Sequence, residues 1–161
     1  MARTVRRSTS KLPTLDHVLE FMRVMWAVDH QLQSVSKRME SSLGLTVPQR
    51  MSLLLIGRHP QITAGELSRI LHLHPGTVSG IVRRLERSGL ITREVDAVDV
   101  RRACLALTER GRDANRRRSG TFEDAVRKTL ATASESDIAA ARRLLGNLAS
   151  QLHAIVEDAA G

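Results

Sequence analysis

The residues that follow His74 divide into an apolar side and a polar side. The apolar residues recur at i, i+3, i+4 and i+7, the spacing of one helix face: Val78, Ile81, Val82 and Leu85. The opposite side carries small, hydroxyl and cationic residues and no large apolar one: Gly76, Thr77, Ser79, Gly80, Arg83, Arg84 and Arg87. We therefore predict a helix that has Pro75 at its first position, ends at Ser88 and packs its apolar face inward.

Short helices are expected ahead of this one, each opened by a capping box. The boxes and the helices they introduce are Thr46 with Gln49 before residues 51–56, and Thr63 with Glu66 before residues 66–71. Residues 72–73 then turn the chain into the helix that follows His74. The stretch 63–88 thus has the pattern of a helix-turn-helix.

Strands and longer helices complete the predicted elements. The strands lie over residues 90–95 and 101–107, around a charged loop at 96–100, and form a hairpin. The helices have apolar residues at spacings of three and four, and they lie over residues 14–42, over 108–131 and from Ser134 to about Ile155. The predicted fold is mainly α with a small β-hairpin.

The net charge of the chain indicates a polyanionic binding partner. The 161 residues suffice for one domain, and 25 Lys and Arg against 17 Asp and Glu give a net charge of +8. Most of the cations are arginines, whose forked guanidinium binds phosphate and guanine. Aromatic residues make up only 2% of the chain, which counts against base stacking on RNA or single-stranded DNA. The polar face of the predicted helix is suited to a DNA groove instead.

The N-terminal residues 1–12 are basic and rich in Ser and Thr. They form either a disordered tail or a basic arm that adds phosphate contacts. No apolar segment follows them, and the chain has no run of 18 apolar residues. We expect neither a signal peptide nor a membrane span, and a cytoplasmic location.

Few residues are of the kinds that build catalytic or metal sites. Cys104 is the only cysteine, which excludes an intramolecular disulfide and a Cys-rich zinc site. His59, His72 and His74 have no Cys or acidic partner at ligand spacing, so no metal or cofactor is expected, and His74 is assigned as a helix cap or phosphate contact. The sequence has no paired carboxylates, nucleophile triad or phosphate loop, so we predict that it is not an enzyme.

Four segments together resemble the MarR family of bacterial transcription regulators. They are GLTVPQ, ELSRILHLHPGTVSGIVRRLERSGLITR, the run from Asp99 to Arg102, and LALTERG. The resemblance extends from about residue 12 to 156. It implies a winged helix-turn-helix with N- and C-terminal dimerisation helices. The single domain would cover 13–161, with a DNA-binding lobe at 45–111 and dimerisation helices at 13–44 and 112–158.

The resemblance also implies how such a protein binds DNA. A homodimer would bind a pseudopalindromic duplex, with the helix after His74 in the major groove. The hairpin tip would insert Arg101 into the minor groove, positioned by Asp99. The residues expected to contact DNA are His74, Gly76, Thr77, Ser79, Gly80, Arg83, Arg84, Asp99, Arg101 and Arg102.

Members of this family typically repress their targets and often release DNA when a small phenolic or anionic ligand binds. The candidate effector pocket consists of Trp26, His30, Met51, Leu55 and Phe122. A core role explains Trp26 equally well. Arg50 stands where the family often has an aromatic residue of that pocket. The alternative hypothesis is a regulator without an effector, controlled by its abundance or by a protein partner.

A redox role for Cys104 is the less favoured reading of that residue. The reactive cysteine of the family's peroxide-sensing branch lies in the first helix, and the first helix of this chain has no cysteine. Cys104 instead belongs to the second predicted strand, near Arg101 and Arg102, which would lower its pKa somewhat.

Overall fold

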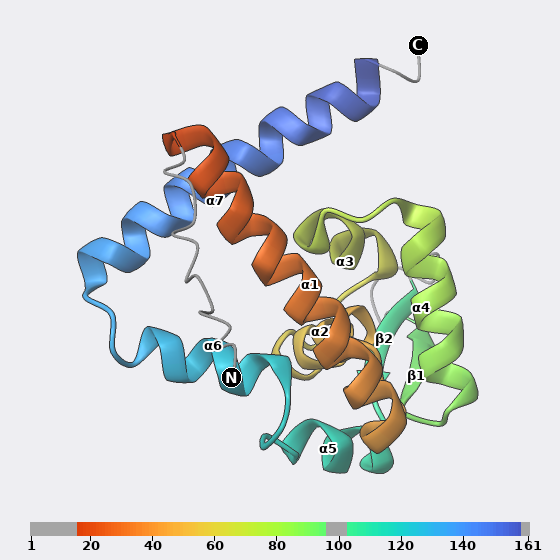
Figure 1. Cartoon of the computed structure of the whole chain (residues 1–161). Helices are drawn as coiled ribbons and strands as arrows, with labels where there is room; N and C mark the ends of the chain where they lie inside the picture. The colour runs from red at the N-terminus through yellow and green to blue at the C-terminus, as the bar shows by residue number, and fades with distance from the viewer. Residues whose placement is uncertain (1–15, 96–102, 159–161) are drawn as a thin grey trace, which may run out of the picture.

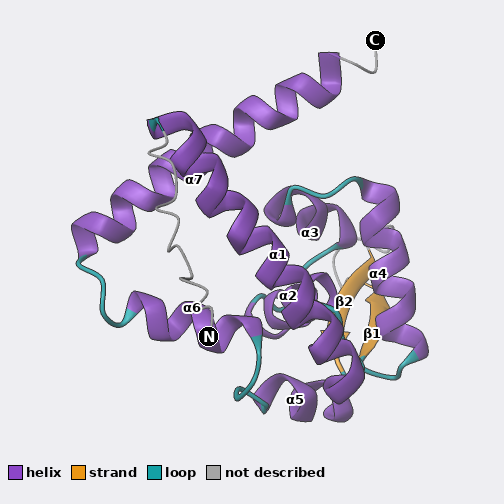
Figure 2. Cartoon of the chain, viewed as in Figure 1, coloured by secondary structure: helices purple, strands orange, loops and turns teal. Residues whose placement is uncertain are grey.

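The computed structural model describes residues 16–95 and 103–158. Within them lie seven helices and two strands, in the order α1 (His17–Leu43), α2 (Val47–Arg58), α3 (Ala64–Leu71), α4 (Pro75–Arg87), β1 (Ile91–Val95), β2 (Ala103–Leu107), α5 (Glu109–Arg116), α6 (Phe122–Leu130) and α7 (Glu135–Asp158). The fold is mainly helical with one hairpin, as the sequence predicts (Figures 1 and 2). We call α2 to α5 with the hairpin the lobe, and α6 with α7 the arm. In Figure 1 the arm extends away from the lobe.

The core of the molecule lies in the lobe. Its buried apolar residues all come from one stretch of the chain: Leu45, Leu53, Ile56, Ile62, Leu67, Val78, Ile81, Val82, Leu85, Leu90, Ile91 and Leu105. The apolar stripe predicted for α4 is fully included, so the inward face of that helix is confirmed. The lobe therefore has a hydrophobic core of its own, to which α1 adds the buried side chain of Met39.

The hairpin pairs β1 with β2 in antiparallel register, with Ile91 opposite Leu107. The chain just before α3 extends it, because the Leu105 N–H donates to the Ile62 carbonyl at 2.9 Å and Thr63 forms a bridge with Cys104. This third segment covers β2, and Cys104 is buried beneath it. The hairpin is thereby fixed to the start of the helix-turn-helix.

Both capping boxes predicted from the sequence are present in the structure. Thr63 accepts from the Glu66 N–H through its hydroxyl, and the Glu66 carboxylate accepts from the Thr63 N–H at 2.8 Å, which is the predicted capping box of α3. The Gln49 side chain likewise accepts from the Thr46 N–H at 3.1 Å. The helix after Thr46 is longer than expected, however, since α2 covers Val47–Arg58 and not only 51–56.

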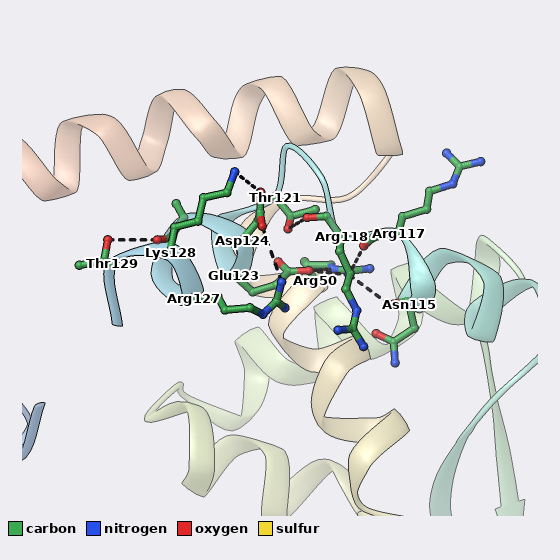
Figure 3. Close-up of polar contacts among 11 residues, drawn as sticks. Arg50, Asn115, Arg117, Arg118, Thr121, Glu123, Asp124, Arg127, Lys128 and Thr129 are labelled. Atoms are coloured by element: carbon green, nitrogen blue, oxygen red, sulfur yellow. Dashed lines mark hydrogen bonds and ion pairs between the residues drawn. The ribbon is translucent and has the colours of Figure 1, made fainter. Parts of the chain in front are cut away.

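The prediction of a single helix over residues 108–131 is wrong, because two helices, α5 and α6, occupy this stretch. Gly120 between them has a φ of +73°, in the left-handed region that interrupts a helix. At the end of α5, the guanidinium of Arg50 donates to the carbonyls of Ala114 at 2.6 Å and Arg117 at 2.6 Å (Figure 3). These carbonyls are satisfied by a side chain of α2 and need no further helical turn.

The Thr108–Gly111 segment explains one of the family-like motifs. The Thr108 hydroxyl donates to the Gly89 carbonyl at 2.7 Å and accepts from the Gly111 N–H at 3.0 Å. The Thr108 N–H also donates to the Leu90 carbonyl at 3.1 Å. This threonine therefore caps α5 and joins it to the turn between α4 and β1.

Gly111→Ala is expected to destabilise the lobe strongly. A Cβ at Gly111 would lie 1.9 Å from the Leu90 carbonyl oxygen, and this obstacle is backbone that cannot rotate away. We expect the free energy of unfolding to fall by about 3 kcal/mol or more, the upper end of the usual cost of overpacking. Urea denaturation measures this loss.

Gly65→Ala is the matched control for that experiment. Gly65 lies in the first turn of α3, and the nearest atom to its added Cβ is the Thr63 hydroxyl oxygen at 4.0 Å. Its stability should stay equal or rise. Equal stability of Gly111→Ala and the natural chain would contradict the close approach of α5 to Leu90.

Candidate nucleic-acid interface

The polar face of α4 is open to solvent along its whole length. Its exposed residues are those that the sequence assigns to DNA contact, together with Arg87: Gly76, Thr77, Ser79, Gly80, Arg83, Arg84 and Arg87. Figure 1 places α4 at the outer edge of the lobe. Arg83, Arg84 and Arg87 are exposed, and none of them has an ion-pair partner among the described residues. The outer face of α4 therefore carries cations and hydroxyls and has no large apolar side chain.

Gly80 packs against no other part of the chain that the structure describes. A Cβ added at Gly80 would meet no heavy atom within 4 Å. A glycine in a helix interior costs about 1 kcal/mol relative to alanine, and nothing in the described chain compensates for that cost. A missing side chain at this position leaves room for another surface to come close to α4.

His74 caps the start of α4, which confirms the cap assignment. Its Nδ1 accepts a hydrogen bond from the Gly76 N–H at 3.1 Å, and its carbonyl accepts from Thr77 and Val78. A neutral ring that accepts through Nδ1 carries its proton on Nε2. His74 thus presents an N–H donor beside the positive end of the α4 dipole, where anions are favoured.

The turn between α3 and α4 is held by a short network. His72 adopts a left-handed conformation with a φ of 51°. The Ser68 hydroxyl donates to the Leu73 carbonyl at 2.5 Å, and the Leu73 N–H donates to the Ser68 carbonyl at 3.1 Å. These bonds fix the angle at which α4 leaves α3 and therefore present its outer face in one orientation.

The hairpin is joined to α4 by an ion pair. Arg93 of β1 donates to Glu86 of α4 at 2.8 Å, with both side chains partly exposed. Such a pair contributes little to stability but sets the hairpin beside the helix. The hairpin tip, with the predicted contacts Asp99, Arg101 and Arg102, lies outside the described residues, as does the basic segment 1–12.

The five residues of the candidate effector pocket differ in exposure. Met51, Leu55 and Phe122 are half-buried, and Leu55 packs against the core of the lobe. His30 is exposed, and Trp26 is 77% exposed. Trp26 is therefore not a core residue of the single chain.

Sequence reasoning did not identify the buried cluster around Arg50. In the sequence, Arg50 stands out only as a replacement for an aromatic residue of the family, yet it is buried and paired with Glu123 at 2.5 Å. A buried arginine needs hydrogen-bond acceptors, and this requirement is what could have indicated such a cluster. The acceptors come from α5 and α6, which lie more than 60 residues further along the chain.

The described residues contain neither a group of three or more His, Cys, Asp or Glu side chains placed to hold a metal ion nor a helix able to cross a membrane. His72 and His74 are both exposed, and Cys104 is buried. The outer face of α4 remains the feature of this part of the chain that is suited to a polyanion.

A helix-turn-helix followed by a hairpin, with a cationic second helix, defines a winged-helix protein of the DNA-binding class. The sequence model of the MarR family matches residues 43–102. These residues contain the helix-turn-helix and the first strand of the hairpin, so this part of the chain is similar to the transcriptional regulators of the MarR family.

Individual relatives agree with this assignment. The organic hydroperoxide resistance transcriptional regulator of Bacillus subtilis is 32% identical over 88 residues, which cover 55% of this chain and 60% of the relative, so the chain spans less than two-thirds of it. A transcriptional repressor of Mycobacterium tuberculosis, Rv2887, is 28% identical over 110 residues, 68% of this chain and 79% of the relative. The structure of Staphylococcus aureus MepR in complex with DNA has a TM-score of 0.66 and 25% identity, covering 86% of this chain and 99% of MepR.

Proposed function

We propose that the protein is a homodimeric repressor that binds a pseudopalindromic DNA duplex through α4 of each chain and is released by a small ligand. The observation that carries the DNA-binding part is the exposed face of α4, with its arginines, hydroxyls and unfilled glycine. The DNA complex of the similar protein MepR supports the same use of this fold. Each α4 would lie in a major groove, with arginines and hydroxyls on phosphates and base edges.

Exposed apolar side chains on α1 and α7 support the homodimer. Those with about half or more of their surface open are Val18, Leu19, Met22, Trp26 and Val28 on α1, and Leu144, Leu145, Leu152, Ile155 and Val156 on α7. Apolar surface of this extent marks an interface. A second copy of the chain offers the same two helices, so a two-fold dimer covers both sets at once. Trp26 then becomes buried between chains.

Gly80→Ala tests the contact of α4 with DNA. The added methyl meets nothing inside the chain, so the free energy of unfolding should rise by about 0.5–1 kcal/mol. The same methyl would enter the space between helix and groove, and binding should weaken by about 1–3 kcal/mol, the value of a good base contact. Fluorescence anisotropy on a duplex selected from a random library by the natural chain measures the affinity. A more stable variant with unchanged affinity would contradict close approach at this position.

Arg101→Ala tests the proposed minor-groove contact of the hairpin tip, in which Asp99 orients Arg101 and Arg102 adds a further contact. We expect operator binding to weaken by about 1–3 kcal/mol, because one cation leaves the negative potential of the groove. Sedimentation velocity should find a folded dimer for both the variant and the natural chain. Undiminished affinity would refute the contact, and a monomeric natural chain would refute the dimer.

The effector hypothesis assigns the half-buried Met51, Leu55 and Phe122, with Trp26 and His30, to a ligand site completed in the dimer. A ligand that favours a helix spacing other than about 34–36 Å would lower DNA affinity by population shift. A panel of aromatic acids tests this: an effector should raise the melting temperature and weaken operator binding together. No response across a broad panel would favour control by abundance or by a protein partner.

A further inference from the structure

One arginine in the core of the lobe reaches the start of the arm. Arg50 of α2 is buried, with 1% of its surface exposed. By contrast, none of the described side chains of α6 and α7 is buried. The Arg50 Nε donates to Glu123 Oε1 at 2.8 Å and its Nη2 donates to the same oxygen at 2.5 Å. Glu123 lies in the first turn of α6, so this pair connects the lobe directly to the arm (Figure 3).

The same guanidinium holds the end of α5. It donates to the carbonyls of Ala114, Asn115 and Arg117, at 2.6, 3.2 and 2.6 Å. The end of a helix carries partial negative charge, so a cation there is stabilised by the carbonyls as well as by Glu123. Arg50 thus binds both sides of the break between α5 and α6.

Apolar packing holds α6 only weakly. Phe122 is half-buried at the start of α6, but Val126 is 37% exposed and Leu130 is 44% exposed. Beyond the contacts with Arg50, α6 touches α1. The direction of the arm therefore depends on a directional charged contact more than on a hydrophobic one.

The Glu123 carboxylate is held through one oxygen. Oε1 accepts both bonds from Arg50, while Oε2 is buried and has no hydrogen-bond partner among the described residues. A buried carboxylate oxygen without a donor is unfavourable, and outward movement of α6 would return it to water. The contact of Arg50 with α6 is therefore made through Oε1 alone.

We propose that Arg50 and Glu123 are positioning residues that set the direction of the arm relative to the lobe. This inference rests on the proposed function in one respect: if the arm dimerises, its direction sets the distance between the α4 helices of the two chains. Arg50 adjoins Met51 and Glu123 adjoins Phe122 in the sequence, but the hydrogen bonds of Arg50 go to Glu123 and to carbonyls at the end of α5. Arg50 and Glu123 determine which spacing of half-sites the dimer fits.

Glu123→Ala is the test variant, because it removes the bond to α6 and leaves the bonds of Arg50 to α5. Asp124→Ala is the matched control: Asp124 is the next residue of the same helical turn, and it pairs with Arg127 and Lys128 on the surface. Both changes remove one acidic side chain near the start of α6. Glu123→Gln, which keeps the volume and removes the charge, is the second variant if Glu123→Ala does not fold.

Spin labels report the direction of the arm within one chain. Arg58 at the end of α2 and Asn147 of α7 are both exposed, and each is replaced by cysteine in a full-length Cys104→Ala background. Labelled chains are mixed with an excess of unlabelled chains, so that double electron–electron resonance measures distances within a chain. The labelled chain without a further change and the labelled Asp124→Ala variant should each give one narrow distance distribution. In the labelled Glu123→Ala variant, this distribution should be broader or shifted.

Operator binding provides the second readout. Duplexes with half-site separations changed by one base pair measure the preference of the dimer for one spacing. We expect Glu123→Ala to reduce that preference by about tenfold, equivalent to about 1.4 kcal/mol, and Asp124→Ala to keep it. A loss of affinity that is equal for all spacings would indicate a merely structural role and would overturn the proposal.

The two readouts separate failure of this inference from failure of the proposed function. Identical distance distributions for the natural chain, Glu123→Ala and Glu123→Gln would overturn the positioning role whatever the DNA data. A natural chain that binds no duplex with a preferred spacing would refute the proposed operator binding, and a changed distance distribution in Glu123→Ala would still support the role of the pair in directing the arm.

Discussion

A guanidinium placed in a protein core must find acceptors, and for Arg50 these come from the end of α5 and from Glu123 of α6. The cation therefore decides where α5 stops, because the carbonyls of its last turn are occupied by a side chain of α2. It also decides where the arm begins, because Glu123 must meet it. Removing either charge of such a pair is costly, although apolar replacement of both can be tolerated, so its value lies in geometry more than in stability.

This contact joins two parts of the molecule that differ physically. The lobe buries a core of its own, with the apolar stripe of α4 inside and the arginines of α4 outside. The helices α1 and α7 leave apolar side chains exposed, which a single chain cannot cover. In the proposed function, DNA contact and assembly therefore use different elements. The connection between lobe and arm runs through α5 and α6, both of which Arg50 contacts.

The helix-turn-helix and the hairpin were predictable because their signals are local. The period of Val78, Ile81, Val82 and Leu85 identifies the inner face of α4 without knowledge of what it packs against. The capping box of Thr63 and Glu66 likewise uses residues three apart. The Thr108–Gly111 motif is recognisable in the sequence, but its reason, the contact of Gly111 with the Leu90 carbonyl, involves backbone from another element.

The sequence by itself determined the helix-turn-helix, the cationic outer face of α4 and the mainly helical fold, since these follow from periodicity, capping and composition within short windows. Only the tertiary structure decided that residues 108–131 form two helices, that Arg50 is a buried link and that Trp26 is exposed in one chain. The physical reason is the same in each case. Each of these residues is buried or exposed according to which distant segments folding brings beside it. A local sequence pattern does not specify those segments.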